Sequence, residues 1–119
     1  MAQHSLEASV AAGSSGPVIT LSGEADLVSA ATLSALISGQ LAGGTRELTI
    51  DASELRFADT ASVRELILAA RTLNERGGRL VLLHPQRPVA RILALFGVDG
   101  TFTIVGETPG GPDAEASAG

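Results

Sequence analysis

The chain has 119 residues, which is enough for one domain with a hydrophobic core and hardly enough for two. Thirteen acidic against eight basic residues give a net charge of −5, which argues against a nucleic-acid-binding surface because such surfaces need clustered Lys and Arg. The lack of cysteine excludes disulfides, thiolate metal sites and a cysteine nucleophile.

The first two segments predict an antiparallel hairpin. Apolar and polar residues alternate over residues 6–10, as in an edge strand, and Gly and Ser at 13–16 favour a turn. The apolar run at 18–21 then predicts a second strand, which we expect to end at Ser22 and Gly23.

Residues 27–41 predict the first helix, because the spacing of the apolar positions becomes helical there. These positions form one stripe: Leu33, Leu36, Ile37 and Leu41. The glycine pair at 43–44 ends the helix. Residues 47–51 follow as a strand with an acidic residue at its carboxyl end.

The second helix has the clearest pattern of the chain. Its apolar positions follow i, i+3, i+4 and i+7 spacing, at Val63, Leu66, Ile67, Ala70 and Leu73. The glycine pair at 77–78 ends this helix. The continuous apolar run at 80–83 is typical of a strand that is covered on both faces.

The last part of the chain predicts one more helix and one more strand. Pro88 suits the first turn of a helix and Gly97 its C-terminal end, and residues 101–105 alternate as a strand. We therefore expect a single domain over 1–105. Residues 106–119, rich in Gly, Pro, Ala and acidic residues, are expected to form a disordered tail.

Two strands followed by three alternations of helix and strand predict an α/β fold. Right-handed crossovers give a mainly parallel central sheet of four or five strands, with the N-terminal strand antiparallel and helices packed against the sheet. In such sheets binding residues gather at the carboxyl ends of the strands. We therefore expect a functional loop over 51–62.

The first ten residues lack the charged start and the apolar stretch of a signal peptide. No apolar run approaches the roughly eighteen residues that a membrane span requires. We therefore expect a cytoplasmic protein that does not insert into a membrane.

At the end of the expected loop, Asp59 and Thr60 place an acid and a hydroxyl at the start of the second helix. A helix N-terminus favours negative charge, so a phosphorylatable hydroxyl there can act as a switch. It can equally be an N-cap, a role open to Asp59, to Thr60, and to Ser62 with Glu65 in a capping box. Because three candidates compete for one helix end, we expect at least one hydroxyl to be free of capping.

The remaining polar residues are expected to be structural. Asp26 can cap the first helix, Asp51 and Glu54 are expected to solvate a loop rather than form a catalytic pair, and His84 follows a strand. The glycine pairs fit neither a P-loop nor a Gly-x-Gly-x-x-Gly fingerprint. We therefore expect no catalytic residue, no metal site and no cofactor.

The chain resembles STAS domains, the family of sulfate-transporter cytosolic domains and bacterial anti-sigma factor antagonists. The segments that carry the resemblance are Val18–Asp26 with its Gly-Glu-Ala-Asp end, Leu48–Ser53, Phe57–Ser62, Gly77–Leu80 and Leu93–Gly97. The resemblance extends from about Leu6 to Val105 and implies a STAS-like fold.

In the antagonist branch of that family, an Asp-Ser-Ser-Gly motif opens the second helix, and its first serine is phosphorylated by the anti-sigma kinase. Aligned on Asp59, that serine becomes Thr60, the second serine becomes Ala61, and the glycine becomes Ser62. The resemblance thus implies Thr60 as the phosphoacceptor, with Ser62 as second choice. It also implies a partner-binding surface: Gly23, Glu24, Asp26, Asp59, Ala61 and Ser62.

The resemblance implies a protein-interaction module and not an enzyme. Such a module binds an ATP-dependent anti-sigma kinase when it is unphosphorylated, so that the sigma factor is released, and a phosphatase resets it; it does not contact nucleic acid directly. Two alternatives stay open. One is a STAS subunit of an ABC-type lipid transporter or stress-sensing complex without phosphorylation. The other is a small ligand-binding protein or enzyme that uses the cleft at the strand ends.

Overall fold

The computed structural model describes residues 6–96 and 101–106. The elements follow in the order β1 (Leu6–Ala12), β2 (Pro17–Ala25), α1 (Leu27–Leu41), β3 (Glu47–Ala58), α2 (Thr60–Glu75), β4 (Arg79–Leu83), α3 (Arg87–Leu95) and β5 (Thr103–Val105). The expected helix end at Gly97 and the expected tail from residue 107 lie outside the described residues.

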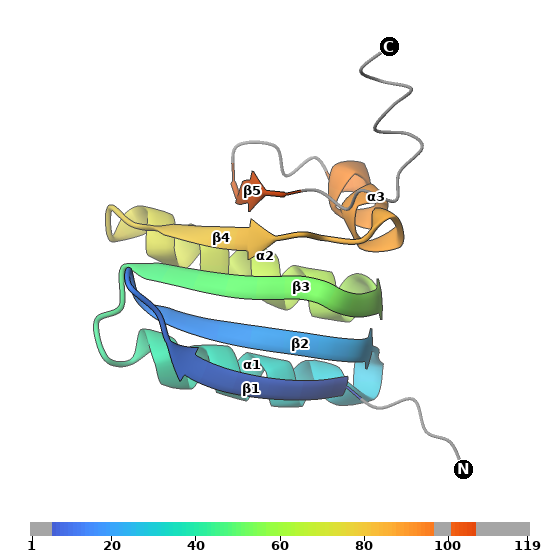
Figure 1. The fold of residues 1–119 in the computed structure, drawn as a ribbon, viewed down its shortest axis with the longest axis horizontal. Helices are drawn as coiled ribbons and strands as arrows, with labels where there is room; N and C mark the ends of the chain where they lie inside the picture. Colours follow the sequence, from blue (N-terminus) through green and yellow to red (C-terminus); the bar gives the residue numbers. More distant parts are fainter. Residues whose placement is uncertain (1–5, 97–100, 107–119) are drawn as a thin grey trace.

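The strands form one sheet in the order β1-β2-β3-β4-β5. The β1 strand is antiparallel to β2, and every other pair of neighbours is parallel. This confirms the predicted hairpin and the mainly parallel sheet. In Figure 1, the N-termini of α1 and α2 lie at the edge of the sheet where the parallel strands end.

The core lies between the sheet and the helices α1 and α2, which Figure 1 shows behind the same face of the sheet. It is aliphatic apart from Phe102, and α3 contributes Val89 and Leu93 to it. The three consecutive residues Leu80, Val81 and Leu82 of β4 are all buried, as the continuous apolar run predicted.

The β3 strand is longer than predicted, and the expected loop over 51–62 is wrong. Two register shifts against β2 each insert an extra residue into β3, so the buried positions change from every second to every third residue. These positions are Leu48, Ile50, Ala52, Leu55 and Ala58. The alternation on which the prediction depended is lost at the first shift, although the strand continues.

Local polar contacts and one glycine accommodate these shifts. The Asp51 Oδ1 atom accepts hydrogen bonds from the Ser53 backbone N–H at 3.0 Å and from the Ser53 hydroxyl at 2.8 Å, an Asx-turn contact within the strand. At the second shift Gly23 has φ +95°, a conformation that favours glycine. Asp51 therefore stabilises a bulged strand rather than solvating a loop, and β2 extends past Gly23 to Ala25.

A core substitution in α2 tests the packing between the helix and the sheet. Leu66 is 1% exposed and Leu68, two residues later on the same helix, is 49% exposed. We expect Leu66→Ala to lower the free energy of unfolding by about 2–5 kcal/mol, because it removes buried methyl groups and leaves a cavity. Leu68→Ala, the control, is expected to change it by less than about 0.5 kcal/mol. Urea denaturation of both variants measures the difference, and equal effects would contradict this packing.

Candidate functional site

The carboxyl ends of β2 and β3 bring the starts of both long helices together. The Asp59 backbone N–H donates to the Ala25 carbonyl at 2.9 Å, and the Ser62 hydroxyl donates to the Asp26 carbonyl at 3.4 Å. Asp26 and Asp59, the residues that precede α1 and α2, are thus neighbours across the sheet edge. Two segments more than thirty residues apart in the chain form one surface.

Asp26 caps α1, as one sequence interpretation predicted. Its Oδ1 atom accepts the Ser29 backbone N–H at 2.9 Å, and the Ser29 hydroxyl accepts the Asp26 backbone N–H at 2.9 Å, which completes a capping box. The hydrogen bond from the Ser29 backbone holds the pKa of the Asp26 carboxyl below its ordinary value, and the Ser29 hydroxyl adds to the effect. The charged form of Asp26 is therefore favoured by the fold.

Asp59 caps α2, and this determines what the neighbouring hydroxyls do. Its Oδ1 atom accepts the Ser62 backbone N–H at 2.9 Å, so the helix end has its cap without either hydroxyl. Thr60 is the first residue of α2 and is exposed. Its hydroxyl makes no hydrogen bond within the part of the chain that the structure describes.

Ser62 is in a different position, although it lies only two residues from Thr60. It is fully buried, and its hydroxyl faces the Asp26 carbonyl. The hydroxyl of Ser62, the second-choice acceptor, is therefore not exposed at the surface in this conformation. The Ser62 hydroxyl instead links the starts of α1 and α2.

The other expected contact residues occupy different positions. Glu24 is half-buried, with its Oε2 atom 4.0 Å from Nη2 of Arg56 on β3, and Ala61 is half-buried in the first turn of α2. Gly23 is paired with residues of both β1 and β3. The structure therefore gathers Glu24, Asp26, Asp59, Thr60 and Ala61 at the sheet edge, whereas Gly23 lies within the sheet.

Three apolar side chains at this edge were not predicted as site residues. Leu27 and Val28 at the start of α1 are 72% and 85% exposed, and Phe57 at the end of β3 is 45% exposed. A sequence signal existed for Val28, because at about 100° per residue it lies roughly 140° around the helix from the buried Leu33. Leu27 and Val28 begin α1 and Phe57 lies at the end of β3, so all three are at this edge of the sheet, and we call them the apolar rim below.

The composition of the edge suits contact with a protein. It combines one exposed hydroxyl, two helix-capping carboxylates and exposed aliphatic and aromatic side chains. Among the described residues, no group of three His, Cys, Asp or Glu side chains is placed to hold a metal ion. In the same part of the chain, no helix is long and apolar enough to cross a membrane.

Comparison with known proteins identifies the family. The family profile described as "Mlab, STAS domain" matches residues 8–106. The chain belongs to the STAS domain family. This confirms the resemblance that the sequence indicated, and the profile includes the sheet, all three helices and the candidate site.

Solved structures of STAS-type regulators are similar to this domain over nearly its whole length. An anti-sigma factor antagonist from Mycobacterium paratuberculosis is 26% identical to this chain and superposes with a TM-score of 0.77. The match covers 98% of this chain and 96% of the antagonist's chain. The antagonist SpoIIAA in its unphosphorylated form is 21% identical over 93% of this chain and 92% of its own, with a TM-score of 0.71. The Bacillus cell fate determinant SpoIIAA in its phosphorylated form is 21% identical over 96% and 97%, with a TM-score of 0.66.

A comparison with curated protein sequences found no match. The similarity to anti-sigma factor antagonists therefore comes from solved structures, and the 26% identity to the mycobacterial antagonist supports a regulatory role of that general kind for this STAS domain.

The capping box at Asp26 predicts a pH dependence of stability. Because the folded-state pKa of Asp26 lies below the ordinary value of 3.8, its stabilising effect is fully present above that value and is lost as the pH falls through the folded pKa. We expect Asp26→Ala to lower the thermal midpoint at pH 7, and we expect the difference between the midpoints of the variant and the wild type to shrink as the pH falls further below 3.8. A pH series of thermal melts measures this, and a constant difference across the series would contradict the assigned role.

Proposed function

We propose that this STAS domain is an anti-sigma factor antagonist that binds an anti-sigma kinase and is switched off by phosphorylation of Thr60. The observation that carries the proposal is that Thr60 is exposed at the first turn of α2. Its hydroxyl is not needed as the helix cap, because Asp59 caps α2. The similarity to the mycobacterial antagonist supports the general role. The existence of a relative in a phosphorylated form supports the switch.

The docking surface in this proposal is the carboxyl edge of the sheet. The apolar rim supplies area that a partner can bury, and Asp26 and Asp59 hold the two helix starts in place beneath it. Binding gains free energy chiefly from burial of such exposed apolar side chains in a partner pocket. The kinase contacts the rim together with the unmodified Thr60 and Ala61.

The switching step transfers one phosphoryl group from ATP held by the kinase. The Thr60 Oγ1 atom attacks the γ-phosphorus, a new O–P bond forms, the bond to the β-phosphate oxygen breaks and ADP leaves, while a base of the kinase takes the hydroxyl proton. A phosphatase restores the hydroxyl when water cleaves the same O–P bond. This domain is the substrate of both enzymes and supplies no catalytic group.

Phosphorylation would change binding without unfolding the domain. It adds about −1.5 to −2 charges, and the N-terminus of α2 tolerates negative charge, which the helix dipole stabilises by about 0.3–1 kcal/mol. On the docking surface, however, the dianion follows the Asp59 cap directly and lies at the same sheet edge as the apolar rim. A partner that buries the rim must then desolvate the phosphate, so the complex weakens.

A charge substitution at Thr60 tests the switch. We expect Thr60→Asp to weaken binding of the co-purifying kinase at least about tenfold, equivalent to about 1.4 kcal/mol, because it places a second carboxylate beside Asp59 on the docking surface. Thr60→Val, which keeps the shape and removes the hydroxyl, is expected to bind like the wild type and to accept no phosphate. Calorimetric titration and phosphopeptide mass spectrometry measure the two effects.

The control for added charge is Asn74→Asp, an exposed position near the far end of α2. It is expected to leave kinase affinity unchanged, since it lies about 20 Å along the helix from Thr60. Wild-type affinity in Thr60→Asp, or persistent phosphorylation in Thr60→Val, would refute Thr60 as the switch.

A second substitution tests the apolar rim separately from the phosphoacceptor. Val28 and Leu95 are 85% and 79% exposed on α1 and α3, so truncating either costs little stability. We expect Val28→Ala to weaken kinase binding several-fold and Leu95→Ala to leave it unchanged. Equal kinase affinities of both variants in the same titration would show that the apolar rim is not part of the docking surface.

A STAS subunit that contacts an ABC ATPase is the second candidate function. The observation in its favour is that Ala61 and the buried Ser62 replace two residues of the antagonist motif, so that one accessible hydroxyl remains at the helix start. Affinity capture followed by mass spectrometry separates the candidates. A histidine-kinase-type ATPase domain among the captured proteins supports the first, and an ABC ATPase supports the second.

A further inference from the structure

The β1 edge of the sheet carries a second surface that the proposed function does not use. The β1 strand forms one edge of the sheet (Figure 1), and six of its seven residues are exposed. Its register against β2 is regular from Leu6 to Ala12, without a bulge. Its backbone groups on the outer edge are therefore available for another strand.

This edge lacks the features that normally prevent pairing between molecules. Edge strands are usually protected by Lys, Pro, bulges or a covering segment, and the sequence of β1, Leu-Glu-Ala-Ser-Val-Ala-Ala, contains no Lys, Arg or Pro. Glu7 is its one charged residue. The opposite edge, β5, has three residues and offers a much shorter template.

The neighbouring helix α1 lacks charged residues. The 15 residues of α1 contain no charged side chain, whereas the 16 residues of α2, on the same face of the sheet, contain four: Arg64, Glu65, Arg71 and Glu75. A surface helix normally has a charged outer face, and a helix that lacks one is typical of a buried position. The exposed face of α1 is therefore suited to being covered.

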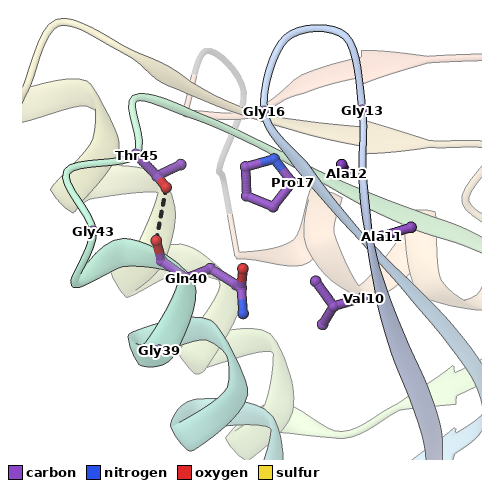
Figure 2. Close-up of a pocket in the computed structure, with 10 residues that line it drawn as sticks. All are labelled: Val10, Ala11, Ala12, Gly13, Gly16, Pro17, Gly39, Gln40, Gly43 and Thr45. Carbon is purple, nitrogen blue, oxygen red and sulfur yellow. Dashed lines mark hydrogen bonds between the residues drawn. The ribbon is translucent and has the colours of Figure 1, made fainter.

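Two hollows follow the gap between β1 and α1. One, of about 560 Å³, lies between Leu6 and Ala8 on the strand and Ala35 and Leu36 on the helix. The other, of about 600 Å³, lies at the hairpin end, where Figure 2 shows Val10 and Pro17 facing Gln40 and Thr45. No charged residue lines either hollow. The uncharged surface is thus continuous from β1 to α1.

We propose that the occupant of this surface is a second copy of this chain, which pairs antiparallel through β1 to give a two-fold symmetric dimer with one ten-stranded sheet. A strand that pairs with its own copy closes the assembly after two molecules. The charge distribution favours this occupant, because two molecules of net charge −5 repel each other least when their contacting surfaces lack charge, and β1 with α1 has one charged residue, Glu7.

The register follows from the length of the strand. Full overlap of β1 with its copy places Ser9 on the two-fold axis, Ala8 opposite Val10 of the partner subunit, and Glu7 opposite Ala11 of the partner subunit. The two Glu7 carboxylates are then kept apart. The same axis brings the two α1 helices to one face of the joined sheet, where the small residues Ala35 and Gly39 are exposed.

Analytical ultracentrifugation of matched charge variants tests the proposal. The wild type is expected at about 24 kDa, twice the chain mass of 12.0 kDa. Val10→Lys is expected at the monomer mass, because the introduced charge would be buried opposite Ala8 of the partner subunit. Val10 and Ile104 are 41% and 42% exposed, on opposite edges of the sheet, so Ile104→Lys is the control and is expected to remain dimeric. A monomeric wild type, or a dimeric Val10→Lys, would overturn the proposal.

A crosslink tests the register and stays informative if Val10→Lys fails to fold. The chain has no cysteine, so Ser9→Cys introduces a single thiol. Across an antiparallel pair it meets its copy at a Cα separation of about 4.5–5.5 Å, within disulfide range. Oxidation is expected to give covalent dimers of Ser9→Cys and none of Ile104→Cys. A dimer without the Ser9→Cys crosslink would form through another surface and would also overturn the proposal.

Discussion

The parallel pairing of β2 with β3, with its two register shifts, is the constraint on which the rest of this domain depends. The extra residues in β3 allow it to end level with β2, so that the Asp59 backbone reaches the Ala25 carbonyl. Without that match, the two helix starts would lie at different heights along the sheet. The shared edge, with its caps, its exposed hydroxyl and its apolar rim, results from this one alignment.

At that edge, capping and signalling are divided among residues that sequence alone treats as equivalent. A helix start needs one side-chain acceptor for its free N–H groups, and Asp59 provides it. Ser62 is turned inward to the Asp26 carbonyl, which joins the two helix starts. The Thr60 hydroxyl is left without a hydrogen bond among the described residues. A switch residue of this kind can be modified at little cost to the fold, because the fold does not use it.

The domain has two surfaces of different chemical character. The carboxyl edge combines acids, a hydroxyl and isolated apolar side chains, which suits an interaction that a change in charge can reverse. The β1 edge and α1 lack charge almost entirely, which suits a lasting contact that is insensitive to modification at Thr60. Because the two surfaces lie at different edges of the sheet, a dimer through β1 would present two docking edges at once, and a partner with two binding modules would gain from avidity.

The sequence by itself determined the order of the elements, the parallel sheet and the presence of a polar, hydroxyl-bearing start to α2, because periodicity and glycine stops are local signals. It could not determine the length of β3, since a bulge breaks alternation in the chain while strand pairing continues in space. Nor could it decide among Asp59, Thr60 and Ser62, because all three types of side chain can cap a helix. Only the tertiary structure decided that, by bringing the Asp26 carbonyl beside Ser62 and leaving Thr60 at the surface. The sequence therefore specifies the opening segment of α2 as a helix start. The contacts of Asp59 and Ser62 with the end of β2 and the residue after it make Thr60 its candidate switch.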